Sequence, residues 1–174
     1  MSARFALMSL CVGSVRGFGF FNPVRHMASR APVATMEATG PVCIVTGGSR
    51  GLGRSIALAL GAEGCKVVVN YMSSAAAAEA VVEEVKALGG DGIAVQADTS
   101  SMEGVKNLFK ATADAFDEPV GVLVNNAGIT RDTLAMRMKE QQWLDVIQCN
   151  LNGCACMRLE TNARTRSPMT AHSA

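Results

Sequence analysis

The sequence predicts an α/β protein in which helices cover both faces of a doubly wound, parallel sheet of four strands. Short apolar runs rich in β-branched residues alternate with helix-like segments from residue 41 onward. A glycine-rich turn follows the first apolar run, and two adjacent asparagines follow the fourth. Hydrophobic residues make up 49% of the 174 residues and charged residues 18%, a balance typical of a single folded α/β domain.

The first expected strand, 41–46, is a short apolar run that ends in glycines, as buried strands of parallel sheets do. The next segment, 52–63, carries apolar residues at three- and four-residue spacing, which predicts a helix that ends before Gly64. Residues 67–69 are three valines, and they predict the second strand.

An alanine-rich helix is expected next, with Ser73 or Ser74 as its N-terminal cap and an end near Gly89. A short, mostly apolar run at 93–96 predicts the third strand, which is closed by Asp98. The order of strand, helix and strand again indicates a crossover connection between parallel strands.

Ser100 and Glu103 have the spacing of a capping box and predict a helix that runs to about Phe116. An apolar run at 120–124 predicts the fourth strand, and a last helix is expected at roughly 139–152. We therefore place one folded domain at 37–153.

The chain after this domain, 154–174, loses its periodicity and is expected to form an irregular tail. Three cysteines lie close together near its start, Cys149, Cys154 and Cys156. A zinc site needs a second set of ligands at a defined spacing, and only the distant His172 could contribute to one. We expect no metal site.

The N-terminal segment 1–36 contains four arginines and no acidic residue. This composition is typical of an organellar targeting segment, which we expect to be disordered. Its apolar run at 5–12 is far shorter than the ~20 residues of a membrane span. A signal-like run followed by a transit-like part favours the plastid stroma, with the mitochondrion as second choice. A plain disordered extension is the alternative.

The glycine-rich turn has the features of a phosphate-binding loop. Backbone N–H groups at a turn between a strand and a helix can approach a pyrophosphate, and the helix N-terminus adds its partial positive charge. We expect Gly47 to allow the tight turn, Gly51 the approach of the phosphates and Gly53 close packing of helix on strand. The loop residues assigned to the cofactor are Gly47, Ser49, Arg50, Gly51, Leu52 and Gly53.

The end of the second strand indicates which dinucleotide is bound. An NAD-specific site usually has a carboxylate there for the ribose hydroxyls, whereas this chain has Asn70 followed by Tyr71. A neutral amide does not repel a 2′-phosphate, and Arg50 can pair with one. These residues favour NADP(H). The alternative for Arg50 is a solvated loop charge.

The ends of the third and fourth strands supply further candidates. Asp98, next to Thr99, could accept a hydrogen bond from the adenine amino group, or could simply end a turn. The paired Asn125 and Asn126 could tie neighbouring strands together or contact the ribose, and the sequence leaves both roles open. The segment assigned to the cofactor here is Asn125, Asn126, Ala127 and Gly128.

These motifs resemble the short-chain dehydrogenase/reductase family, and residues 125–139 are similar to its 3-oxoacyl-(acyl-carrier-protein) reductases. The resemblance covers 41–153. It implies a Rossmann-like fold, NADPH as reductant, a 3-oxoacyl substrate carried on acyl carrier protein in type II fatty acid synthesis, and a homotetramer. It implies that Asn150 is catalytic and holds a water in a proton relay. Neither nucleic acid nor membrane is an expected partner of the mildly acidic body.

The resemblance also implies a serine, a tyrosine and a lysine beyond Asn150, but the only tyrosine is Tyr71 and no lysine follows Asn150. We interpret the chain as a truncated reductase that is inactive alone and whose assembly is doubtful, because loss of a general acid costs ~10²–10⁴-fold. The strand at 120–124 would form an unpaired edge. Alternatives are a non-catalytic NADP(H)-binding or subunit-docking fragment, and a chain without a stable fold.

Overall fold

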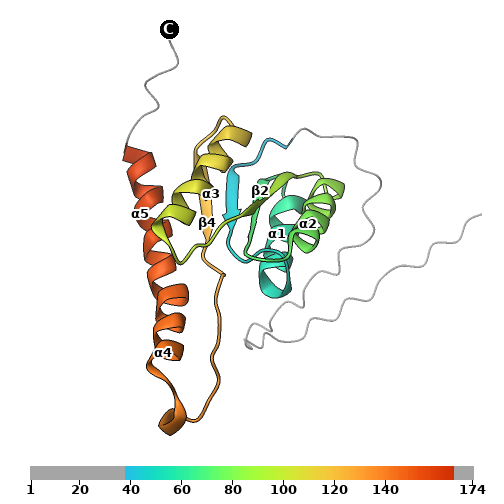
Figure 1. Cartoon of the computed structure of the whole chain (residues 1–174). Helices are drawn as coiled ribbons and strands as arrows, with labels where there is room; N and C mark the ends of the chain where they lie inside the picture. Colours follow the sequence, from blue (N-terminus) through green and yellow to red (C-terminus); the bar gives the residue numbers. More distant parts are fainter. Residues whose placement is uncertain (1–37, 167–174) are drawn as a thin grey trace, which may run out of the picture. The chain divides into compact units, whose positions relative to one another are not determined.

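The computed structural model describes residues 38–166 (Figure 1). The predicted targeting segment, 1–36, and His172 lie outside the described residues. Between residues 38 and 166, no helix combines the length and the apolar character needed to cross a membrane.

The predicted fold class is confirmed, because four parallel strands alternate with helices. The elements in chain order are β1 Val42–Val45, α1 Gly51–Ala62, β2 Lys66–Tyr71, α2 Ala75–Ala87, β3 Asp91–Gln96, α3 Met102–Ala115, β4 Val120–Val124, η1 Ala135–Arg137, α4 Glu140–Ile147, the π-helix η2 Gln148–Asn152 and α5 Gly153–Arg166. The order in the sheet is β3-β2-β1-β4. A long loop with the short 3₁₀ turn η1 follows β4 and leads into the helical arm, which consists of α4, η2 and α5.

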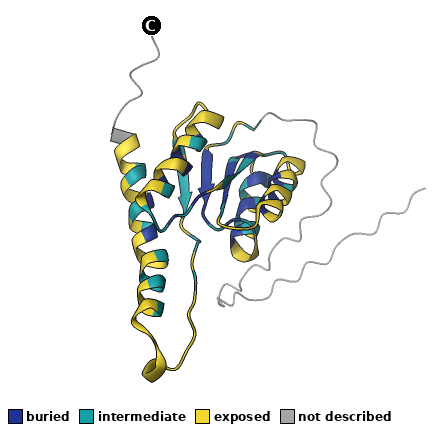
Figure 2. Ribbon diagram, in the orientation of Figure 1, coloured by how far each residue is buried: buried dark blue, intermediate teal, exposed yellow. Residues whose placement is uncertain are grey.

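Alternate residues of the central strand face opposite layers. Cys43 and Val45 belong to an apolar cluster with residues of α1 and α2, and Val42 and Ile44 belong to a second cluster with residues of α3 and α5. All four residues of β1 are fully buried, and Figure 2 shows the buried residues gathered on the sheet and on the helix faces turned toward it. Helices on both faces make the sheet doubly wound.

Strand β4 forms one edge of the sheet, as expected for residues 120–124. It pairs with β1 through a register that shifts between Val42 and Cys43, and most of its residues are only partly buried. No strand among residues 38–166 pairs with its other side. An edge of this kind exposes backbone groups that can pair with another strand.

The prediction of an irregular tail is wrong for the part that the structure describes, because residues 153–166 form helix α5. The predicted last helix instead ends at Ile147, and a π-helical turn carries the chain into α5 (Figure 1). Packing explains the helix: Met157 is fully buried in the second apolar cluster, and the Arg164 guanidinium lies 5.6 Å from the centre of the Phe109 ring. Tertiary contacts here override a weak local pattern.

Of the two predicted helix caps, the one of α3 is wrong and the one of α2 is confirmed in position. The N-cap of α3 is Ser101, whose hydroxyl accepts a 3.1 Å hydrogen bond from the Gly104 N–H, so Ser100 and Glu103 do not form the predicted capping box. Ser74 occupies the N-cap position of α2, but its side chain accepts no capping bond. The α3 cap lies one position later than predicted, and both helices form where expected.

Candidate functional site

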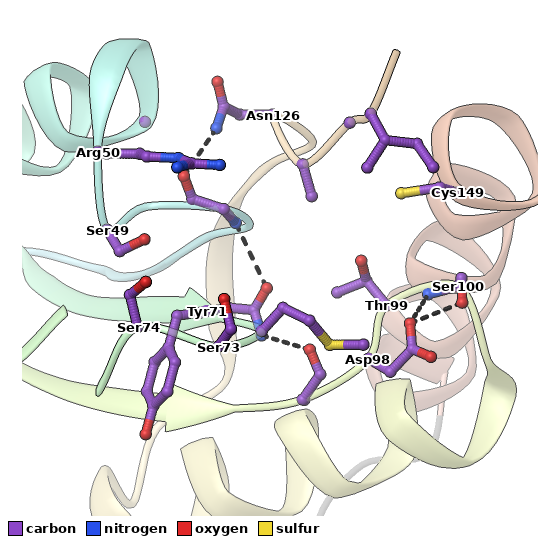
Figure 3. Close-up of a pocket in the computed structure, with 18 of the residues that line it drawn as sticks. Ser49, Arg50, Tyr71, Ser73, Ser74, Asp98, Thr99, Ser100, Asn126 and Cys149 are labelled. Atoms are coloured by element: carbon purple, nitrogen blue, oxygen red, sulfur yellow. Dashed lines mark hydrogen bonds between the residues drawn. The ribbon is translucent and has the colours of Figure 1, made fainter. Parts of the chain in front are cut away.

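A cavity of about 750 Å³ opens at the carboxyl ends of the four strands (Figure 3). It lies between the glycine-rich loop on one side and the helical arm on the other. Ligands bind at this edge in open α/β sheets, beside the point where the strand order reverses. Most of the predicted cofactor residues line it: Gly47, Ser49, Arg50, Gly51, Leu52, Gly53, Asn70, Tyr71, Asp98, Thr99, Asn126, Ala127 and Gly128. Asn125 and Asn150 are not among its lining residues.

The glycine-rich loop adopts backbone conformations that glycine tolerates best. Gly47 has φ +63° and Gly51 has φ +56°, both in the left-handed region. A side chain at Gly51 would meet no atom within 4 Å, so this glycine forms an open face of the cavity. Helix α1 begins here with no capping side chain at Arg50 and no acidic residue in its first turn. Its N-terminal N–H groups and positive dipole end are therefore available to an anion.

Gly53 allows the close packing that the sequence predicts. A Cβ atom there would fall against the Gly47 carbonyl oxygen and 2.5 Å from Asn126 Nδ2. Real Cβ atoms do not approach other atoms this closely, so the first turn of α1 requires glycine at this position.

Thr46 and Asn126 tie the first and fourth strands together. The Asn126 side-chain amide donates to the carbonyl oxygens of Thr46 (2.8 Å) and Gly47 (3.1 Å). The Thr46 hydroxyl donates to the Val124 carbonyl at 3.1 Å and accepts from the N–H groups of Asn126 and Ala127, both at 3.0 Å. Of the two roles left open for the asparagines, the structure shows the tie, and it is made by Asn126.

Asn70 holds the glycine-rich loop against the ends of β2 and β3 through its side-chain amide. Its amide donates to the carbonyls of Val95 (3.3 Å) and Ala97 (3.0 Å), and its Oδ1 accepts from the Gly47 N–H at 3.4 Å. Asn70 is 2% exposed, so these bonds satisfy an otherwise buried amide. A carboxylate here would lose both donors.

Arg50 and the residues after β2 form the rim on the same side. Arg50 is exposed, and within residues 38–166 no ion pair engages its guanidinium. Figure 3 shows Ser73, Ser74 and Tyr71 near Ser49, below the loop that carries Arg50. The rim therefore offers one cation and several hydroxyl groups and no carboxylate.

Asp98 follows β3, forms a side-chain turn and also faces the cavity. Its Oδ1 accepts from the N–H (2.9 Å) and the hydroxyl (2.6 Å) of Ser100. The structure thus shows the turn role that the sequence left open for Asp98. The side chain remains on the cavity wall beside Thr99 (Figure 3).

The opposite wall is built by the helical arm and the loop after β4. Gln148 donates from Nε2 to the Ser100 carbonyl at 2.6 Å. Asn150 accepts from the Ile129 N–H at 2.9 Å and donates to the Ile129 carbonyl at 3.0 Å. Its side chain thereby holds the loop against the arm, and Asn150 lines a second, smaller hollow of about 250 Å³.

Burial raises the pKa of two thiols, Cys149 on the cavity wall and Cys43 in β1. Burial, followed by the charges of Asp98 and Cys154, raises the pKa of the Cys149 thiol, and Arg131 opposes this shift. Burial also raises the pKa of Cys43 in β1 to about 12. Both shifts disfavour the thiolate, which is the nucleophilic form of cysteine. Among residues 38–166, no three histidine, cysteine or acidic side chains cluster in a way that could hold a metal ion.

Several lining residues were not predicted from the sequence. Ser73 and Ser74 follow β2 directly, so their position at the carboxyl edge was a usable signal. Arg131, Asp145 and Gln148 offered none, because they are reached through a loop and a helix whose path the sequence pattern does not specify. The lining residues that were not predicted are Met72, Ser73, Ser74, Ala97, Ser100, Ile129, Arg131, Asp145, Gln148 and Cys149.

Comparison with known proteins agrees with this geometry. The chain is 56% identical over 115 residues to a 3-oxoacyl-(acyl-carrier-protein) reductase of Synechocystis, covering 66% of this chain and 46% of that protein. It is 57% identical over 110 residues to a Staphylococcus aureus protein of the same name, covering 63% and 44%. The chain therefore spans less than half the length of these curated relatives.

Two solved structures have the same arrangement of elements. A short-chain dehydrogenase from Mycobacterium avium superposes with a TM-score of 0.68 at 35% identity, covering 73% of this chain and 47% of that one. A short-chain dehydrogenase/reductase variant from Serratia marcescens also gives a TM-score of 0.68, at 28% identity, covering 74% and 52%. The family model for short chain dehydrogenases matches residues 41–162. This protein belongs to the short-chain dehydrogenase family.

Proposed function

We propose that this chain binds NADP(H) in the cavity at the carboxyl edge of its sheet. The observation that carries the proposal is the open N-terminus of α1 beside Gly51, with an exposed Arg50 at the rim and no acidic residue in the first helical turn. A pyrophosphate fits such a cradle, because backbone N–H groups and the helix dipole both favour an anion. The cavity volume of about 750 Å³ is within the range of cofactor sites.

Each part of the wall would hold a different part of the dinucleotide. Gly47 to Gly53 would hold the pyrophosphate, Arg50 the 2′-phosphate, and Asp98 the adenine amino group. The nicotinamide half would then face the wall formed by Gly128 and Cys149. When bound, the reduced cofactor supplies a hydride to a carbonyl carbon.

For the whole protein we propose reduction of a 3-oxoacyl group carried on acyl carrier protein, as the names of the Synechocystis and Staphylococcus relatives suggest. These 174 residues contain one tyrosine, Tyr71, and it ends β2 on the side of the glycine-rich loop rather than on the wall that would face the nicotinamide. No lysine follows Asn150. We therefore propose that these residues alone bind the cofactor without turning over a substrate, since no positioned proton donor is available.

Fluorescence titration of the full chain with NADPH and NADH tests the proposal. We expect NADPH to bind more tightly by roughly tenfold or more, because a charge-assisted bond to the 2′-phosphate contributes about 1.5–3 kcal/mol. Arg50→Gln should remove most of that preference and leave NADH binding unchanged. Arg158→Gln, an exposed arginine on α5, is the matched control. Equal affinities in the wild type would contradict the assignment of Arg50, and absence of binding would contradict the proposed function.

A second candidate function is docking on other subunits without catalysis. It is favoured by the open edge of β4 and by large apolar side chains exposed on the arm, among them Trp143, Leu151 and Leu159. Exposed patches of this kind mark interaction surfaces or aggregation sites. Copurification of the chain with a full-length reductase of the same family, in a complex of defined stoichiometry measured by gel filtration, would support this role. Recovery of the chain only as a monomer would exclude it.

We propose that residues 1–36 direct the protein to the plastid stroma, with the mitochondrion as the alternative. The support is the absence of acidic residues and the presence of four arginines in this segment. A fusion of residues 1–36 to a fluorescent protein tests the proposal directly. Plastid fluorescence is expected, and diffuse cytosolic fluorescence would contradict it.

A further inference from the structure

A line of hydrogen bonds connects the helical arm to the end of β3. Asn152 donates from Nδ2 to Gln148 Oε1 at 2.7 Å, and Gln148 Nε2 donates to the Ser100 carbonyl at 2.6 Å. The N–H and hydroxyl of Ser100 both donate to Asp98 Oδ1. Asp98 is therefore held through Ser100 by a side chain that is 50 residues away in the sequence.

The π-helical turn places Gln148 where it can make this contact. Gln148 begins η2, and Gly153 begins α5 immediately after it. A Cβ atom at Gly153 would lie 2.9 Å from the Thr99 carbonyl oxygen, so the arm approaches the end of β3 as closely as glycine permits. π-helical turns inside α-helices occur frequently at functional sites.

The two ends of the Gln148 amide have distinct partners, which fixes its orientation. Oε1 accepts from Asn152 and Nε2 donates to Ser100, so a flipped amide would lose both bonds. The Ser100 peptide is thus anchored on its carbonyl side by Gln148 and on its N–H side by Asp98. Without the Gln148 donor the Ser100 carbonyl loses its bond to the arm, and only bonds within residues 98–101 then orient the Asp98 carboxylate.

We infer that Gln148 is a positioning residue for Asp98, which lets the site distinguish a base that carries an amino group from a base that carries a carbonyl group at the same position. This inference rests on the proposed function, in which Asp98 accepts from the adenine amino group. A carboxylate held in one orientation accepts from an amino group and repels a carbonyl oxygen. A carboxylate that rotates loses this discrimination before it loses contact with the cofactor.

The test compares NADPH with its hypoxanthine analogue, which has a carbonyl in place of the adenine amino group. Both affinities are measured by fluorescence for the full chain and for Gln148→Leu and Gln148→Glu. Glutamate has nearly the shape of glutamine but no donor for the Ser100 carbonyl. Gln141→Leu is the matched control, because Gln141 is exposed on α4 and donates to Asp145 outside this line of hydrogen bonds.

We expect the wild type and Gln141→Leu to bind NADPH roughly tenfold more tightly than the analogue, which corresponds to about 1.4 kcal/mol. In both Gln148 variants the ratio of the two affinities should fall toward one. A merely structural role would lower both affinities equally, and this result would overturn the inference, as would an unchanged ratio.

Two further outcomes separate the inference from the proposed function. If the wild type binds neither NADPH nor the analogue, the proposed function fails. If it binds both equally, NADP(H) binding stands, but Asp98 does not read the base and the inference is wrong. Far-UV circular dichroism establishes that each variant is folded, and if Gln148→Leu does not fold, the near-isosteric Gln148→Glu decides.

Discussion

The two walls of the cavity are held in different ways. The wall at the glycine-rich loop rests on β1, whose residues are fully buried, and on Thr46 and Asn70, each 2% exposed. The wall formed by the helical arm is held by exposed polar contacts of Gln148 and Asn150, and Trp143 on α4 is 58% exposed. One wall is part of the core, whereas the other is attached to it.

This difference indicates that cofactor affinity and the stability of the fold depend on the same residues at the glycine-rich loop, but not at α4 and η2. Local opening costs little where few apolar contacts and mostly exposed hydrogen bonds hold a segment. We expect changes near the loop to affect both unfolding and cofactor affinity, and changes on α4 and η2 to affect affinity alone. Helix α5 is an exception within the arm, because Met157 is buried in the core.

The largest expected effect is in the core beneath the arm. Phe109→Ala should lower the free energy of unfolding by about 3–5 kcal/mol, because it removes a buried ring from the second apolar cluster. Leu159→Ala, at an exposed position of α5, should change it by less than about 0.5 kcal/mol. Urea unfolding measures both, and similar losses would contradict the contrast drawn here.

The tie between β1 and the segment after β4 should show the next largest effect. Thr46→Val keeps the shape of the side chain but leaves the N–H groups of Asn126 and Ala127 without their acceptor. We expect a loss of about 2–3 kcal/mol in the free energy of unfolding and weaker NADPH binding. Thr46→Ser, which keeps the hydroxyl, should restore most of both. A valine variant as stable as the wild type would show that the tie does not hold the loop.

A steric change at the loop should follow in size. Gly53→Ala forces a Cβ atom against the Gly47 carbonyl, and we expect about 1–3 kcal/mol of destabilisation together with a clear loss of NADPH affinity. Gly64→Ala is the matched control, because its φ of +75° strains alanine by about 1 kcal/mol but its surroundings are open and remote from the cavity. Equal NADPH affinities in the two variants would show that Gly53 is not needed for cofactor binding.

The smallest effect near neutral pH concerns the Cys43 thiol. Its folded-state pKa of about 12 lies above the ordinary value of 9.0, so its contribution to stability is complete below pH 9 and is lost as the pH rises from 9 toward 12. The stability difference between the wild type and Cys43→Ala should therefore be constant below pH 9 and shift against the wild type above it. A difference that does not vary with pH would contradict the burial of this thiol.

The sequence predicted the loop side of the molecule better than the arm. Strands β1 and β2 were recognisable because valine and isoleucine are concentrated in short runs, and the turn after β1 needs glycine at defined positions. Helix α5 was missed because its cysteines, threonines and asparagine are weak helix formers, and its formation depends on the burial of Met157. No local pattern announces a contact of that kind.

The candidate site divides in the same way. Asn126 was placed correctly at the cavity, but its partner Thr46 was not singled out, because a threonine at a strand end is common. Gln148 carries no sequence signal, since a glutamine on a helix usually faces solvent. Its position depends on the π-helical turn, which the sequence pattern did not predict.

The central claim is that the backbone at the start of α1 binds the phosphates of NADP(H). Amide hydrogen exchange of the full chain, measured with and without saturating NADPH, tests it most directly. We predict slower exchange at Gly51, Leu52 and Gly53, whose amides are in the first turn of α1, with no change in α5. Binding that leaves exchange in this turn unaltered would contradict the claim.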